Sequence, residues 1–251
     1  MSKNKIVYLR WGERYTQEHV DRLFDRVNDN CSIDFDFITM DVSIGEAYDK
    51  MQALQKKYYR GCSDPESSIT ENPLDTFKRE DAGGIAHFRK YLMFLRDHDH
   101  DEDTVFLYLD LDTLIQGDLA YFFDLDLDKP WILRSWEFNK DFMWKRLYNV
   151  RCAPYFNSSV MLWKRDQNRR IFNELVNSDN LEQYFFTYGI NDNWLFHRFG
   201  PYAYNQEHRD WFQFFRKGVV ISEDPTLETK DTIIKTLAGM SMAEKNKLCL
   251  N

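Results

Sequence analysis

A short apolar stretch that ends in two acids constrains the fold of this chain more than any other feature. Residues 105–109 are all apolar or aromatic, and Asp110 and Asp112 follow them. An apolar run of this length between polar segments predicts a β-strand that is buried on both faces. Since carboxylates are rarely buried without partners, a cation or hydrogen-bond donors should meet these two at the strand end.

Two interpretations of this acidic pair are open. Both acids could face water or cap a turn, which needs no ligand. Alternatively they bind a metal, which we favour because ligands of open α/β sheets bind just beyond the carboxyl ends of the strands. An extended backbone would point Asp110 and Asp112 to opposite faces, so a shared ion requires a bend after the strand.

The residues before this strand predict a parallel sheet flanked by helices. Residues 5–10 and 32–40 are predicted strands, and each is followed by a predicted helix. Thr16 can cap the first of these helices, and Val20, Leu23, Phe24 and Val27 recur on one face of it. The second helix covers residues 46–59, which completes a β-α-β-α order.

The remaining chain continues the alternation of strands and helices. A helix with Leu92 and Leu95 on one face precedes the acidic strand, and residues 131–134 predict a strand after it. A polar elbow at 157–159 leads into another apolar strand, and residues 166–176 and the segment after 188–194 are predicted helices. We expect one α/β domain over 1–251, with a nucleotide-binding half at about 1–117, an acceptor-side half at about 118–223 and a charged, helical tail at about 224–251.

Composition and charge argue against a nucleic-acid partner and indicate the compartment of the protein. The formal net charge of −8 argues against a nucleic-acid ligand, and a phosphate ligand would need a cation beside it. The four cysteines form no C-x-x-C pair, which predicts free thiols in a reducing compartment. We find no apolar run that could span a bilayer and no leader at the N-terminus, so we expect a cytoplasmic protein.

Several blocks, taken together and in order, resemble the glycosyltransferases of the GT-A fold. The central segment, YLDLDTLIQGDL, resembles their D-x-D segment, in which the second acid carries more of the metal contact. The other blocks that match are residues 11–15 (WGERY), 90–94 (KYLMF), 157–161 (NSSVM) and 192–194 (DNW). The resemblance implies a Rossmann-like domain with a mixed, mostly parallel sheet, a nucleotide-diphosphate sugar donor and Mn²⁺ or Mg²⁺. UDP is the expected nucleotide, with GDP the alternative, and a glycan or another hydroxyl compound is the expected acceptor.

This resemblance and the sheet topology together assign candidate roles to individual residues. Asp110 and Asp112 would hold the metal, with Leu111 between them at the donor, and Asp192 would contact the donor sugar or act as the base. Lys90 would place a positive charge near the donor, and Asn157 and Ser158 would bind sugar hydroxyls. The nucleotide would rest at the end of the first strand, on Leu9, Arg10, Trp11 and Tyr15.

Ordinary structural roles compete with several of these assignments. Trp11 could be a core residue, Lys90 a solvated lysine, Asn157 a turn residue and Asp192 a helix N-cap. The chain also departs from the pattern: Asn193 stands where Gln is usual, and the C-terminal H-G-x-K-P and S-[FY]-K endings are missing. The third metal ligand is therefore unassigned, with His197 and His208 as candidates.

Two other functions fit part of the sequence. A haloacid-dehalogenase-like phosphatase would use Asp110 as nucleophile and Asp112 as acid and base. Its motif, however, normally opens the domain, and about a hundred residues precede it here. A non-catalytic sugar- or nucleotide-binding module would also suit the aromatic content of 16%.

Overall fold

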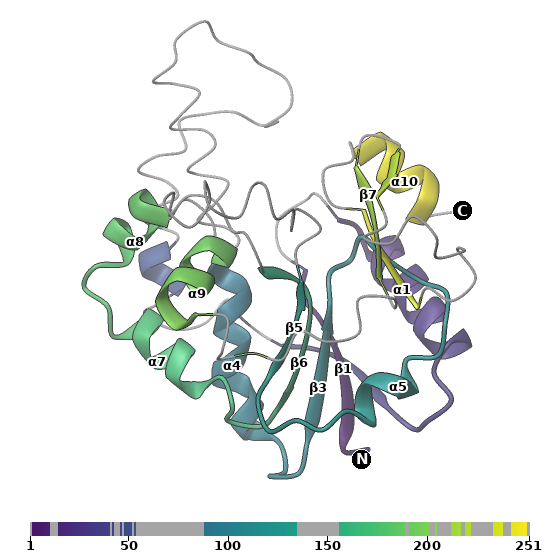
Figure 1. Cartoon of the computed structure of the whole chain (residues 1–251), viewed down its shortest axis with the longest axis horizontal. Helices are drawn as coiled ribbons and strands as arrows, with labels where there is room; N and C mark the ends of the chain where they lie inside the picture. Colours follow the sequence, from purple (N-terminus) through teal and green to yellow (C-terminus); the bar gives the residue numbers. More distant parts are fainter. Residues whose placement is uncertain are drawn as a thin grey trace, which may run out of the picture.

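The protein is built on a five-stranded sheet with helices on both faces (Figure 1). The computed structural model describes residues 2–10, 15–40, 42, 46, 48–51, 53, 88–134, 156–188, 191–200, 204, 212–216, 219–221, 233–237 and 242–249. The strand order is β2-β1-β3-β6-β5. The strands are β1 (Asn4–Tyr8), β2 (Asp36–Thr39), β3 (Val105–Leu109), β5 (Trp131–Arg134) and β6 (Phe156–Lys164).

The sheet is mixed and mostly parallel, as predicted. Strand β1 pairs in parallel with both β2 and β3, whereas β6 runs antiparallel to β3 and to β5. Every strand except β6 therefore points the same way. The carboxyl ends of β1 and β3 consequently lie next to each other at one edge, where Leu9, Arg10 and the acidic pair follow them.

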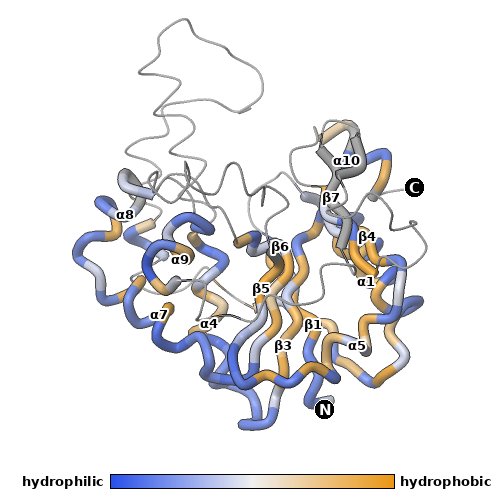
Figure 2. Tube along the Cα trace, viewed as in Figure 1, coloured by the Kyte–Doolittle hydropathy of each residue, from blue (hydrophilic) through white to orange (hydrophobic). Residues whose placement is uncertain are grey.

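Side chains alternate between two cores, one on each face of the sheet. On β3, Phe106 and Tyr108 belong to one core, and Leu107 and Leu109 belong to the other. Apolar residues accordingly concentrate along the strands in Figure 2. Successive side chains of β3 point to opposite faces of the sheet, and both faces are covered by a core. Residues 105–109 therefore show no alternation of apolar and polar residues, and the predicted strand with two buried faces is confirmed.

Helices on the first face pack around Trp163 and Trp194, both fully buried. Tyr91, Phe94 and Phe172 join this core. The elements on this side are η1 (Arg89–Leu92), α4 (Met93–Arg96), η2 (Asp97–Asp99), α7 (Arg169–Val176), α8 (Leu181–Tyr188) and α9 (Asn191–Phe199). The predicted helix face with Leu92 and Leu95 is confirmed, because Leu92 is buried in this core and Leu95 packs against it.

The opposite face is covered by α1 (Gln17–Asp29) and α5 (Ala120–Phe123) (Figure 1). Thr16 is the N-cap of α1, and Val20, Leu23 and Val27 are buried, as the periodicity predicted. Phe24 instead remains 42% exposed. The described residues of the predicted second helix, 46, 48–51 and 53, are also helical.

A smaller second sheet, which the sequence analysis did not predict, lies beside the first. Its order is β4-β9-β7-β8, with β4 (Thr113–Ile115), β7 (Phe212–Arg216), β8 (Val219–Ile221) and β9 (Ile234–Thr236). The C-terminal tail is therefore not helical throughout: it contributes strand β9, which pairs with β4, and then helix α10 (Met242–Cys249). The chain thus leaves the main sheet after Leu109 and enters the second sheet at Thr113.

The polar elbow at 157–159 lies inside strand β6 rather than before it. The pairing of β5 with β6 jumps from Ile132↔Met161 to Leu133↔Asn157, so residues between these partners bulge out of the ladder. Such a bulge bends a strand and redirects its side chains. Among the described residues, no helix has the length and apolar character needed to cross a bilayer.

We expect substitution of Phe106 by Ala to lower the free energy of unfolding by about 3–5 kcal/mol, because it opens a cavity in a packed core. Phe106 is fully buried and stacks on Trp163 with ring centroids 5.3 Å apart. Tyr121→Ala is the matched control: its ring is 55% exposed, and it should change stability by less than about 0.5 kcal/mol. Urea denaturation measures both, and an equal loss in the two variants would contradict this core.

Asp97 is a buried acid at the edge of the sheet opposite to the acidic pair. Its carboxylate accepts a hydrogen bond from the backbone N–H of Asp166 (3.1 Å) and lies 3.8 Å from the guanidinium of Arg169. Burial outweighs both contacts and raises the pKa of Asp97 to about 6. The folded protein therefore binds a proton here more tightly than the unfolded chain does, and this contribution to stability is lost as pH rises through about 6.

Asp97→Asn, which stays neutral, should remove this pH dependence. Relative to the variant, the wild type should lose about 1–2 kcal/mol of unfolding free energy between pH 4.5 and pH 7.5. Chemical denaturation across that range gives the two curves. If they run parallel, Asp97 does not titrate as burial predicts.

Candidate functional site

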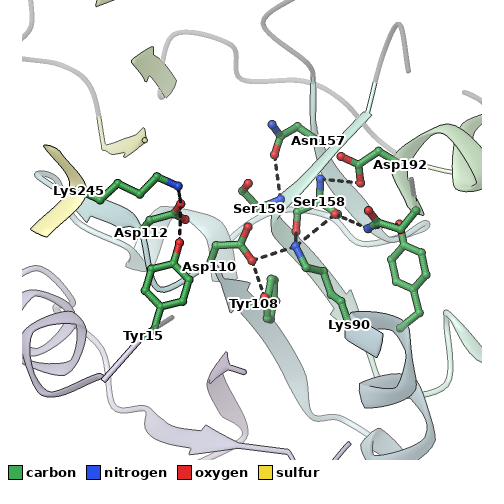
Figure 3. A network of polar contacts seen from close by, with 12 residues as sticks. Tyr15, Lys90, Tyr108, Asp110, Asp112, Asn157, Ser158, Ser159, Asp192 and Lys245 are labelled. Carbon is green, nitrogen blue, oxygen red and sulfur yellow. Dashed lines mark hydrogen bonds and ion pairs between the residues drawn. The ribbon is translucent and has the colours of Figure 1, made fainter. Parts of the chain in front are cut away.

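The acidic pair lies in a turn that connects the two sheets. The backbone N–H of Asp110 donates to the carbonyl of Ser159 (2.9 Å), and the N–H of Thr113 donates to the carbonyl of Asp110 (3.1 Å). This turn supplies the bend that the sequence analysis required. The two carboxylates pair with different lysines (Figure 3).

Asp110 is held by Lys90 and Tyr108. Its Oδ1 accepts the hydroxyl of Tyr108 at 2.5 Å and lies 2.9 Å from the Lys90 Nζ. Burial raises the pKa of Asp110, but the Lys90 charge and the hydrogen bonds from Tyr108 and Lys90 outweigh it, so the pKa is lowered overall. Asp110 is therefore an anion at neutral pH.

Lys90 is buried, with its side chain 4% exposed, and its ammonium is fully engaged. It lies 2.9 Å from Asp110 Oδ1, and it donates to the carbonyl of Ser158 at 2.9 Å and to the Ser158 Oγ at 3.3 Å. An ammonium has three donors, so these contacts use all of them. Lys90 is therefore not a solvated lysine; it joins η1, the end of β3 and β6.

The bulged segment of β6 carries this network to α9. Ser158 Oγ accepts a hydrogen bond from the amide of Asn191 (2.9 Å), which also donates to the hydroxyl of Tyr91 (3.2 Å). The backbone N–H of Ser158 donates to Asp192 Oδ1 at 3.3 Å. The predicted residues Lys90, Asp110, Ser158 and Asp192 thus belong to one cluster.

Asp192 has the electrostatics of a base. Burial raises its pKa, although Lys90 and Ser158 act in the opposite direction. A carboxylate with a raised pKa accepts a proton more readily near neutral pH. Asp192 is the second residue of α9, so its place in the first helical turn and its role in the cluster are compatible.

Asn157 makes a local contact: its Oδ1 accepts the backbone N–H of Ser159 at 2.9 Å. This is the turn-type hydrogen bond that the sequence left as an alternative. Figure 3 shows the Asn157 amide pointing away from Lys90, on the upper side of the cluster.

Asp112 forms a separate group on the other side of the turn. Its Oδ2 accepts the hydroxyl of Tyr15 at 3.0 Å and lies 2.5 Å from the Nζ of Lys245. Lys245 comes from α10, and both side chains of this ion pair are largely buried, at 5% and 13% exposed for Lys245 and Asp112. Tyr15, predicted to touch the nucleotide, therefore also positions an acid.

The other predicted residues lie as follows. Leu9 and Leu111 are buried in the two cores. Arg10 is exposed and donates to Gln17 (3.3 Å). His197, on α9, packs against the ring of Tyr188 at the end of α8 and against the ring of its neighbour Phe196, which fits a structural histidine. Trp11 and His208 lie outside the described residues.

The donor set at the turn suits a hard cation. Asp110 and Asp112 supply carboxylate oxygens, which Mg²⁺ and Mn²⁺ prefer, and Mg²⁺ often takes only one or two carboxylates besides phosphate oxygens. Within the described part of the chain, no group of three or more His, Cys, Asp or Glu residues gathers to hold a metal. The residues therefore fit a metal whose remaining ligands come from a bound phosphate or from outside the described residues.

The sequence analysis did not identify Tyr108 and Lys245 as partners of the two acids. Tyr108 was treated only as an apolar strand residue, although its hydroxyl reaches the acid two positions later on the chain. Lys245 was one of several charges in the tail, and it lies 133 positions from Asp112. No local signal distinguishes it from Lys247 on the same helix.

The chain has the fold of GT-A glycosyltransferases. No protein-family profile and no curated protein matches it. Among solved structures, it is similar to the galactosyltransferase LgtC in complex with donor and acceptor sugar analogues (TM-score 0.56, 16% identity, covering 98% of this chain and 95% of that one). A glycosyltransferase involved in glycosylating the major capsid of PBCV-1 gives a TM-score of 0.52 at 14% identity, with 98% and 97% covered. The bifunctional WbbM gives 0.55 at 9% identity, with 99% of this chain and 49% of WbbM covered.

We expect Lys90→Met to lower the free energy of unfolding by about 2–4 kcal/mol, because it leaves the half-buried Asp110 carboxylate without its counter-ion. Asp110→Asn should also destabilise the protein, since it leaves the ammonium without its partner. The double variant should recover part of the loss, because neither charge remains. Thermal or chemical denaturation of the four proteins gives the coupling energy, and strictly additive losses would contradict the ion pair.

Proposed function

We propose that the protein is a metal-dependent glycosyltransferase. It would move a sugar from a nucleotide-diphosphate donor, with UDP the expected nucleotide, to a glycan or another hydroxyl acceptor. The observation that carries this proposal is the pair Asp110 and Asp112 in the turn after β3, at the carboxyl edge of a GT-A sheet, with Asp192 in the adjoining cluster.

The diphosphate leaving group accumulates negative charge as the glycosidic bond breaks. A divalent cation bound at Asp110 and Asp112 would supply Lewis-acid stabilisation to its phosphate oxygens. The protein's own contribution is to keep Asp110 ionised and to orient both carboxylates: Lys90 and Tyr108 fix Asp110, and Tyr15 fixes Asp112. This preorganisation lowers the cost of assembling the site when the donor arrives.

The cluster beyond Lys90 would serve the sugar side of the reaction. Asp192 would contact the donor sugar or accept the proton of the acceptor hydroxyl, a role that its raised pKa supports. Lys90 would act through the bulged segment of β6 by holding Ser158 against Asp192, rather than by touching the donor.

The phosphatase alternative is less consistent with the architecture. It requires the acidic strand to open the domain, whereas β1, α1 and β2 precede β3 here and pair with it in one sheet. A non-catalytic binding module remains the second candidate, because the same fold and acids could bind a nucleotide sugar without transfer. Release of nucleoside diphosphate from a nucleotide sugar in the presence of Mn²⁺ separates the two.

We expect one nucleotide from a panel of UDP, GDP, CDP and dTDP to raise the thermal midpoint in the presence of Mn²⁺. Ligand at about 100 times its dissociation constant stabilises the folded state by about 2.7 kcal/mol, which corresponds to a shift of roughly 5–10 °C for a chain of this size. The shift should need both Mn²⁺ and Asp112 and should vanish in Asp112→Asn. Differential scanning fluorimetry with and without the metal measures it.

Asp126→Asn is the control for this experiment. It removes the same charge from an exposed position that precedes β5, at the opposite edge of the sheet, so the nucleotide shift should persist. Two results together would identify a phosphatase instead of a transferase. They are the absence of any nucleotide shift and hydrolysis of a phosphate monoester that is lost in Asp110→Asn.

A further inference from the structure

Lys245 occupies the carboxylate that the proposed metal would need. Its Nζ lies 2.5 Å from Asp112 Oδ2, the same oxygen that accepts the Tyr15 hydroxyl. A divalent cation bound to Asp112 would lie a few ångströms from this ammonium, in a place where both side chains are largely buried and poorly hydrated. Two positive charges at that separation repel strongly because the surroundings screen them weakly.

Helix α10, which carries Lys245, is attached mainly by polar contacts. Among its described side chains, Lys245 alone is buried, whereas Ala243, Asn246, Lys247 and Leu248 are exposed and Met242 is half-buried. The described side chains of α10 therefore add little apolar burial when the helix docks. Polar contacts of Lys245, Asn246 and Leu248 contribute to its position.

Two of these polar contacts connect α10 to α1. His19 is buried, and its Nδ1 accepts the backbone N–H of Thr16 at 3.2 Å, so its Nε2 carries the proton and donates to Asn246 Oδ1 at 3.0 Å. Arg26 donates to the carbonyl of Leu248 at 2.8 Å. Together with the Lys245–Asp112 pair, these contacts attach the second half of the helix through three of its residues.

The chain before α10 is anchored independently of the helix. Strand β9 pairs with β4, and the N–H of Leu237 donates to the carbonyl of Asp112 at 3.3 Å. The backbone on either side of the acid therefore stays in place whether or not Lys245 is docked. Undocking α10 would free the carboxylate without dismantling the second sheet.

We propose that Lys245 is a tethered cation that competes with the divalent metal for Asp112, so that docking of α10 and metal binding exclude each other. The proposal rests on the proposed function in one respect, namely that a metal binds Asp112. In the metal-free protein the ammonium neutralises the acid and holds α10 against α1. Metal binding displaces the ammonium and releases the helix, and by linkage anything that loosens α10 strengthens metal binding.

The decisive measurement is the dissociation constant of Mn²⁺, by electron paramagnetic resonance or calorimetry, for matched variants. Lys245→Met should bind Mn²⁺ at least roughly 10-fold more tightly. The competing ammonium is gone, so Asp112 is always free to bind the metal. Lys247→Met is the control: it removes the same charge from an exposed position of the same helix and should change the constant less than about 2-fold. Asp112→Asn should weaken binding in every background.

A second variant keeps the test independent of Lys245 itself. Asn246→Ala removes the contact with His19 but leaves Lys245 and Asp112 intact, so it should also tighten Mn²⁺ binding, by a smaller factor. Hydrogen exchange gives a readout that needs no metal affinity: Mn²⁺ should accelerate exchange of the α10 amides in the wild type, whereas in Lys245→Met they should exchange fast with or without the metal.

Three outcomes would overturn the proposal. Weaker or unchanged Mn²⁺ binding in Lys245→Met would mean that Lys245 does not compete with the metal. Slower exchange of α10 with Mn²⁺ would mean that the metal and the docked helix coexist. If a nucleoside diphosphate binds the wild type without metal and loses that binding in Lys245→Met, the ammonium is itself the permanent cation of the site. The transferase proposal then stands without its metal. If no variant binds Mn²⁺ tightly and none binds a nucleotide, both proposals fail.

Discussion

The ion pair between Lys90 and Asp110 is the interaction on which the geometry of the site depends. It joins three elements that are far apart in sequence, because Lys90 lies in η1, Asp110 follows β3, and the carbonyl that Lys90 also binds belongs to β6. A charged pair in this position loses hydration, and it persists because Lys90 uses all of its donors and Asp110 also accepts from Tyr108. The same contacts that satisfy the buried charges therefore fix the bulged part of β6, and through it Asp192.

The two acids of the motif are used differently although one residue separates them. Asp110 pairs with the buried Lys90 of η1 and with Tyr108 of its own strand. Asp112 pairs with a lysine on a helix that buries little of its own surface, so its neutralisation depends on the docking of that helix. Asp110 thus pairs with a lysine of η1, and Asp112 pairs with a lysine of α10, which is a separate helix far along the chain. If Lys245 and a divalent cation compete for Asp112, as proposed, the docking of α10 would control when Asp112 can bind a metal.

The main sheet and the identity of the acids could be predicted from the sequence because both depend on local signals. Five apolar residues followed by acids specify a buried strand with carboxylates at its end, and the helical spacing of Val20, Leu23 and Val27 specifies a helix packed on that sheet. The second sheet had no such signal: β4 and β9 are three residues each, too short for a pattern, and they exist because they pair with each other across the chain. The elbow at 157–159 was recognised, but its position inside β6 follows from a pairing irregularity with β5.

What the sequence determined by itself is the class of the fold, the place of Asp110 and Asp112 at the end of the central strand, and the grouping of Asp192 with polar residues that open a helix. Only the tertiary structure decided how the charges are neutralised. Lys90 lies buried against Asp110 and Ser158, Tyr15 and Tyr108 donate hydrogen bonds to the acids, and Lys245 reaches Asp112 from 133 positions away. The physical reason is that hydrophobic periodicity is a property of neighbouring residues, whereas the partner of a buried charge is selected by whichever donor the packed chain brings within a few ångströms.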